Sequence, residues 1–218
     1  MITGVSLVGC SPSVPVEDTG SSAARPSGSE SELQRRPSES DTGEAATNSA
    51  AQTSAEDNAS LYSPEAFREA ALNGKRRIVE VCLESGMKAD QADAKGFTPL
   101  AMAAYNGHTD VVQLLVDRGA TVDARDFQGN TPLIHAASGP APETVTTLLD
   151  AGADINAVDS GEHFTPLMMA AALGNTRVVK VLLQRGARTD MVDVDGDAAI
   201  DFARENGHME IVKLLSDS

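Results

Sequence analysis

The sequence predicts an all-α solenoid of about five stacked helix-turn-helix units with projecting β-hairpin loops, preceded by a disordered N-terminal tail. Two observations lead to this prediction. A Thr-Pro-Leu triplet begins at Thr98, Thr131 and Thr165, spaced by 33 and then 34 residues, and such self-similarity is typical of repeat architectures. The first 60 residues contain none of the seven aromatic side chains, and residues 11–60 show no hydrophobic period, so residues 11–60 cannot bury enough apolar area to offset the entropy lost on ordering.

Composition excludes several functional classes. The formal net charge of −15 makes a phosphate backbone an unfavourable partner, so we expect no nucleic-acid binding. Aromatic residues make up only 3% of the chain, and Trp is absent, which argues against a base-stacking surface. No apolar run reaches the roughly 18 residues that a membrane-spanning helix needs. Two cysteines, Cys10 and Cys82, cannot form a disulfide framework.

The first element is residues 1–10, which end in Leu7-Val8-Gly9-Cys10. This tetrapeptide resembles a bacterial lipoprotein cleavage box, although the apolar stretch before it is very short and no Lys or Arg precedes it. The resemblance implies a truncated signal, acylation of Cys10, a membrane tether and a location in the bacterial cell envelope, outside the cytoplasm. The alternative is an incidental cysteine in a frayed tail of a cytoplasmic protein.

The second element, residues 11–60, is dominated by Ser, Ala, Glu, Thr, Gly and Pro. We interpret it as a disordered, Ser-rich linker. If Cys10 is acylated, a flexible tether of this length has an r.m.s. reach of about 40 Å.

Residues 61–218 form the repeat domain, with units at about 61–92, 93–125, 126–158, 159–192 and 193–218. In each complete unit, Thr is expected to cap a helix whose first residue is Pro. A pair of small residues then allows close helix approach, and a glycine such as Gly107 or Gly174 ends the helix in the left-handed conformation. An aliphatic stripe at helical spacing predicts a second helix, and Asp-x-x-Gly predicts a turn at a hairpin tip.

This pattern resembles the ankyrin repeat family, because several positions recur together over residues 61–218. The resemblance implies a non-catalytic, monomeric module without a cofactor that binds a protein partner. In that family, partners bind across the hairpin tips and the exposed side of the first helices. Transferred position by position, this surface includes Lys95, Phe97, Tyr105, Arg125, Phe127, Gln128, Asn130, His163, Phe164 and Leu173.

Some of these aromatic side chains have a second interpretation. Aromatic anchors dominate interface energetics, so a row of them at the hairpin tips is expected to bind a partner. Phe97 and Phe164 directly precede the Thr-Pro-Leu triplets. Both side chains could instead fold back onto the neighbouring repeat.

Metal binding and catalysis are the competing functions. Asp193-Val194-Asp195-Gly196-Asp197 concentrates carboxylates, which are ligands that calcium prefers, and it suggests a metal-responsive module as the alternative function. However, the EF-hand loop needs glycine at position six and glutamate at position twelve. Here glycine is fourth and Arg204 is twelfth. No nucleophile with a base and an orienting acid is recognisable, so we expect no enzyme activity.

The third and fourth units depart from the repeat pattern. The third carries Ser138-Gly139-Pro140-Ala141-Pro142 between its helices, and the two prolines predict a stiff turn and a shortened first helix. The fourth has one extra residue before Phe164, which predicts a deformed tip. His135 takes a position that is filled by Met or Phe in other units, so we expect it to be partly buried.

Overall fold

The computed structural model describes residues 63–218, which belong to one compact unit. This part contains ten helices and, apart from one isolated bridge, no strand pairing. The helices are α2 (Pro64–Leu72), α3 (Arg76–Glu84), α4 (Pro99–Tyr105), α5 (Thr109–Asp117), α6 (Pro132–Ser138), α7 (Pro142–Asp150), α8 (Pro166–Ala172), α9 (Thr176–Gln184), α10 (Ala199–Glu205) and α11 (Met209–Ser216). The signal predicted at residues 1–10, the lipidation of Cys10 and the linker at residues 11–60 lie outside the described residues.

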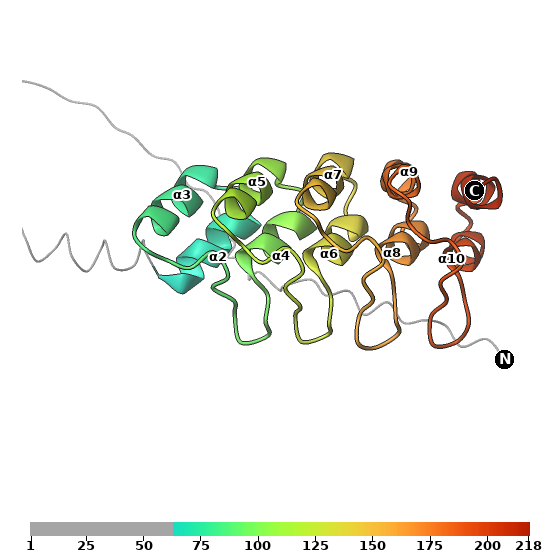
Figure 1. The fold of residues 1–218 in the computed structure, drawn as a ribbon, viewed down its shortest axis with the longest axis horizontal. Coiled ribbons are helices and arrows are strands. Elements are labelled where there is room, and N and C mark those ends of the chain that lie inside the picture. Colours follow the sequence, from blue (N-terminus) through green and yellow to red (C-terminus); the bar gives the residue numbers. More distant parts are fainter. Residues whose placement is uncertain (1–62) are drawn as a thin grey trace, which may run out of the picture. The chain divides into compact units, whose positions relative to one another are not determined.

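The helices form two rows (Figure 1). The inner row is α2, α4, α6, α8 and α10, and each inner helix contacts the next. The outer row is α3, α5, α7, α9 and α11, which contact one another in the same order. One inner and one outer helix make a unit, and the hairpin loops project from the inner row, away from the outer helices (Figure 1). The predicted all-α solenoid is therefore confirmed.

Local sequence explains where the inner helices begin. The Oγ1 atoms of Thr98, Thr131 and Thr165 accept hydrogen bonds from the backbone N–H three residues later, at 3.1, 3.4 and 3.1 Å. Each threonine thereby satisfies one of the N–H groups that a helix start leaves unpaired. In the fifth unit Ala198 stands in the threonine position, and there the carboxylate of Asp201 accepts the Ala198 N–H at 3.1 Å.

Helix ends follow the glycines, with one exception. Gly107 and Gly174 have φ values of 73° and 75°, as a left-handed helix end requires. Gly139 is extended instead, with φ −93° and ψ 163°. The predicted shortening of the third unit's inner helix is wrong, because α6 has seven residues, like α4 and α8. The prolines lie beyond its end, and Pro142 begins α7, where a missing N–H breaks no helical bond.

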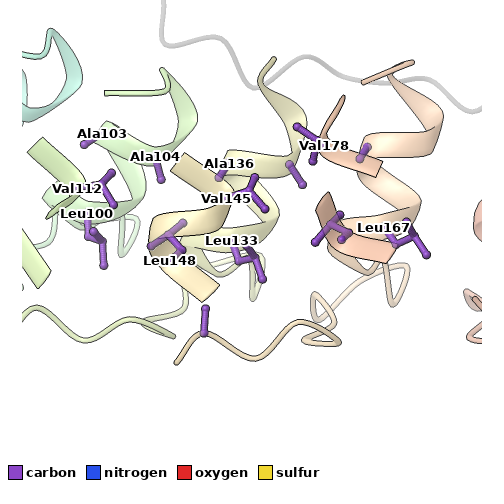
Figure 2. Packing of buried hydrophobic residues seen from close by; sticks show 14 of the residues in the cluster. Leu100, Ala103, Ala104, Val112, Leu133, Ala136, Val145, Leu148, Leu167 and Val178 are labelled. Atoms are coloured by element: carbon purple, nitrogen blue, oxygen red, sulfur yellow. The ribbon is translucent and has the colours of Figure 1, made fainter. Parts of the chain in front are cut away.

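The core runs through the stack between the two rows. Leu100, Leu133 and Leu167 are buried in one hydrophobic cluster, and they take matching places on successive inner helices (Figure 2). Val145 and Leu148 of α7 approach them from the outer row (Figure 2). Since no unit can bury its apolar face alone, stacking supplies the burial that stabilises each unit.

Candidate interaction surface on the hairpin loops

Each of the second to fifth units begins with a hairpin loop, at residues 93–97, 126–130, 159–164 and 193–197. We call these the tip loops. A backbone hydrogen bond closes each one, from the N–H of its first residue to the carbonyl of its last, at 3.0 to 3.2 Å. Neighbouring loops are also joined: the N–H of Phe127, Ser160 and Val194 donates to a carbonyl of the preceding loop at 2.9, 2.8 and 3.1 Å. The loops therefore hold a fixed register.

The first aspartate of the tip loops has a structural role. In the third unit, Asp126 Oδ1 accepts hydrogen bonds from the backbone N–H groups of Gln128 and Asn130, both at 2.9 Å. In the fifth unit, Asp193 Oδ1 accepts in the same way from Asp195 and Asp197, at 3.0 and 2.8 Å. Its carboxylate is thus turned into its own loop. Within residues 63–218, no three His, Cys, Asp or Glu side chains are grouped as a metal ion would require.

The extra residue of the fourth tip loop has a conformational consequence. His163 has φ 62° and is the only residue other than glycine with positive φ in the described part of the chain. Side chains with a Cβ atom rarely adopt this conformation, which carries strain of about 1 kcal/mol or more. The prediction of a deformed fourth tip is confirmed.

Aromatic rings gather where the second and third units meet. The ring of Phe97 lies 5.4 Å from that of His135 and 6.1 Å from that of Phe127, and Tyr105 lies 6.2 Å from His135. These separations suit edge-on aromatic packing. We call these four side chains the aromatic junction. Two of them reach solvent, with Phe127 59% and Tyr105 38% exposed.

A hydrogen bond from His135 to a buried carboxylate supports the aromatic junction. His135 Nε2 lies 2.9 Å from Asp126 Oδ2, and the Asp126 side chain is only 1% exposed. Because a carboxylate only accepts, Nε2 must carry the proton. Burial works to raise the pKa of Asp126, but the hydrogen bonds from His135 and the backbone N–H groups of Asn130 and Gln128 outweigh it and hold that pKa below its ordinary value. The expected partial burial of His135 is confirmed.

Phe97 and Phe164 do fold back onto the following unit. Both are partly buried, Phe97 against His135 and Phe164 against Phe202, whose ring centroid is 4.9 Å away. The remaining candidate residues divide by exposure. Asn130 is partly buried, and the exposed residues are Lys95, Tyr105, Arg125, Phe127, Gln128, His163 and Leu173.

Arg125 is less available to a partner than its exposure suggests. Its Nη1 donates to the carbonyls of Gly129 and Val158 at 2.8 and 2.6 Å. The guanidinium group therefore links the tip loop of the third unit to Val158, the residue directly before the tip loop of the fourth unit. Lys95, by contrast, takes part in none of the ion pairs of residues 63–218.

Two surface residues were missed by sequence reasoning. Val192 and Val194 flank the loop aspartate of the fifth unit, and each is more than half exposed. In this loop, only the aspartates were considered as functional residues. An alternation of valine and aspartate in a loop is itself a signal of apolar side chains directed to solvent. The support of Asp126 by His135 was also missed, because nothing in the spacing indicates that a loop and a helix meet there.

Reactive chemistry is not recognisable in the described residues. Cys82 is buried, and burial raises the pKa of its thiol, which disfavours the nucleophilic thiolate. His108 and His208 are used for packing: each ring nitrogen Nε2 donates to a carbonyl of the preceding unit, at 2.9 and 3.2 Å. In the described part of the chain, no helix has both the length and the apolar character that a membrane span requires.

Comparison with known proteins agrees with this geometry. The family model for ankyrin repeats (3 copies) matches residues 67–159 and 141–218. Over 61 residues the chain is 43% identical to the E3 ubiquitin-protein ligase hecd-1 of Caenorhabditis elegans. That stretch is 27% of this chain and only 2% of the relative, so the likeness concerns a short segment of both proteins. Because the family model covers most of the sequence, the chain belongs to the ankyrin repeat family.

Proposed function

We propose that this chain is a non-catalytic, monomeric docking module that binds a protein partner across its tip loops and the adjoining ends of its inner helices. One observation favours this surface. In residues 63–218, five of the seven exposed large hydrophobic side chains lie on this surface or directly beside it in sequence. We call these five the tip face: Tyr105, Phe127, Leu173, Val192 and Val194.

The physical reason is preorganisation. Loops that are hydrogen-bonded to one another lose little conformational entropy when a partner binds. Interface energy is concentrated in a few aromatic anchors near the centre of a contact. Phe127 and Tyr105 are suited to that role because their rings are already held against Phe97 and His135, respectively. Ankyrin repeats are typically non-catalytic, and this favours a binding role for the chain.

The proposal is tested by comparing matched variants of the full chain as bait in host extract. Phe127→Ala with Tyr105→Ala removes the two aromatic anchors. Met209→Ala is the control, since Met209 is 64% exposed but lies on the outer helix α11. We expect quantitative mass spectrometry to identify proteins that the wild type and the control enrich and the double variant loses. If every enriched protein survives the double substitution, the tip face is not the binding surface.

Attachment to a membrane is a separate proposal that rests on the sequence of residues 7–10. We infer that acylated Cys10 tethers the repeats outside the cytoplasm of a bacterium, because the residues before it resemble a lipoprotein cleavage box. Two or three acyl chains anchor a protein stably, whereas one does not. Mass spectrometry of the mature N-terminus in the native host decides the matter. An unmodified Met1 would exclude the tether and favour a cytoplasmic protein.

A further inference from the structure

We infer that the partner presents an extended segment with a large apolar side chain and, about six residues away, one or more Lys or Arg side chains. The apolar side chain packs at Phe127 and Tyr105, and the basic side chains lie over the tip loops of the fourth and fifth units. This inference rests on the proposed function and specifies the chemistry and length of what the tip face recognises.

The apolar end is set by the aromatic junction. Phe127 and Tyr105 come from a loop and a helix end of neighbouring units, and both have rings in contact with partly buried rings behind them. An aliphatic or aromatic side chain of the partner that packs on these two rings would remove apolar area of both proteins from water, which favours binding. The exposed base Lys95 belongs to the adjacent tip loop, so a second positive charge is disfavoured at this end.

The charge changes sign toward the C-terminal end of the tip face. Glu162 and Asp195 are exposed on the tip loops of the fourth and fifth units, and neither takes part in an ion pair of the described residues. The backbone hydrogen bond from Val194 to the carbonyl of Glu162 holds these two loops together. The Lys or Arg nearest to Asp195 along the chain is Arg188, which is already bound to Asp190 at 3.0 and 2.9 Å.

Exposed valines beside these carboxylates favour long basic side chains. Val192 and Val194 flank Asp193 and are exposed. Lys and Arg can lay their methylene stems on such apolar surface while the charged head reaches a carboxylate. Apolar contact and charge complementarity at this end therefore indicate the same class of partner residue.

The spacing follows from the stack. Packed helices lie about 8–10 Å apart, so the tip loop of the third unit and the tip loop of the fifth unit are separated by roughly 20 Å. An extended chain rises about 3.3 Å per residue, so the two ends of the contact are about six residues apart on the partner.

The experiment selects binders from a random displayed 12-residue peptide library, with the full chain as bait. We expect enriched sequences to combine an aromatic or aliphatic residue with Lys or Arg about six positions away. A matched pair of variants tests the charge: Glu162→Lys with Asp195→Lys on the tip loops, and Glu84→Lys with Glu143→Lys on the outer helices as the control. By fluorescence anisotropy at low salt, the first should weaken the best peptide at least tenfold and the control less than twofold.

The outcomes separate this inference from the proposed function. Enriched peptides that need Phe127 but lack basic residues, or that bind the charge-reversed variant equally well, overturn the inference and leave the docking surface intact. Peptides that bind the Phe127→Ala, Tyr105→Ala variant as well as the wild type overturn both. A library that yields no enriched sequence overturns the inference, since a surface that recognises one extended segment must select among random ones.

Discussion

We predict that replacing Ala141 with His stabilises the boundary between the second and third units by about 1 kcal/mol. In the second, fourth and fifth units, the side chain of the residue directly before the outer helix donates a hydrogen bond to a backbone carbonyl of the preceding unit. His108 and His208 donate from Nε2 to the carbonyls of Leu72 and Ala172, 36 residues earlier. Asn175 donates to two carbonyls at 2.9 and 3.0 Å. In the third unit this position is Ala141, whose side chain has no hydrogen-bond donor.

The structure offers an acceptor on the preceding unit. The residue 36 positions before Ala141 is Tyr105, whose carbonyl ends α4 as that of Leu72 ends α2. In the first boundary, the His108 ring lies 2.5 Å from where a Cβ on Gly74 would stand. In the second, the Cβ of Ala141 itself lies 2.7 Å from the same point on Gly107, so position 141 lies closer to this glycine than position 108 does to Gly74, and an added ring must turn away from Gly107.

Thermal and urea unfolding of the full chain measures the effect. One net hydrogen bond contributes about 0.5–1.5 kcal/mol, and for a domain of this size 1 kcal/mol corresponds to a rise in Tm of about 2–4 °C. Ala141→Phe is the control, because it adds a ring without a donor. If the His and Phe variants are equally stable, the hydrogen bond to the Tyr105 carbonyl is not formed and the reasoning is refuted.

Four further predictions concern stability, all measured by urea unfolding of the full chain. Asp126→Ala should lower the free energy of unfolding by about 2–4 kcal/mol, because it leaves several partly buried donors unpaired. Since the folded-state pKa of Asp126 lies below its unfolded value, its stabilisation is complete above about pH 4 and is lost as the pH falls through the folded pKa. The wild type should therefore lose more stability than Asp126→Asn between pH 5 and pH 3, and parallel curves would contradict this. Leu133→Ala should cost about 2–5 kcal/mol, since Leu133 is fully buried; a loss under 1 kcal/mol would contradict the core position. His163→Gly should exceed His163→Ala in stability by about 1 kcal/mol, because only glycine adopts φ 62° without strain; equal stability would contradict the strain.

Features set by a few neighbouring residues could be predicted from the sequence. The caps at Thr98, Thr131 and Thr165 depend on bonds that reach only three residues along the chain, and all three were predicted. Gly107 was predicted to be left-handed for the same reason. The length of α6 was predicted wrongly because the two prolines were expected to interrupt the helix, whatever their position relative to its end. The helix ends at Ser138, before either proline could interrupt it.

The candidate site was less predictable, because exposure depends on how units stack. Phe97 and Phe127 both lie in tip loops, yet one ring is turned onto the next unit and the other toward solvent. The bond between His135 and Asp126 joins a helix to the loop nine residues before it, and only the closed loop brings the two side chains together. Repeat periodicity places such residues in register but does not determine which face of a loop they take.

The boundary between the second and third units lacks a side-chain hydrogen bond from position 141, and it contains the aromatic junction near the tip loops. Stability of a repeat stack is approximately a sum of unit terms and nearest-neighbour terms. Rings that couple the second and third units therefore contribute to folding as well as to any contact with a partner. Phe97 and His135 belong to this coupling, so alanine at either position would lower binding even if the partner never touched it. Phe127, at 59% exposed, separates the two effects most cleanly. A loss of affinity in Phe127→Ala at unchanged Tm is the measurement that identifies a direct contact.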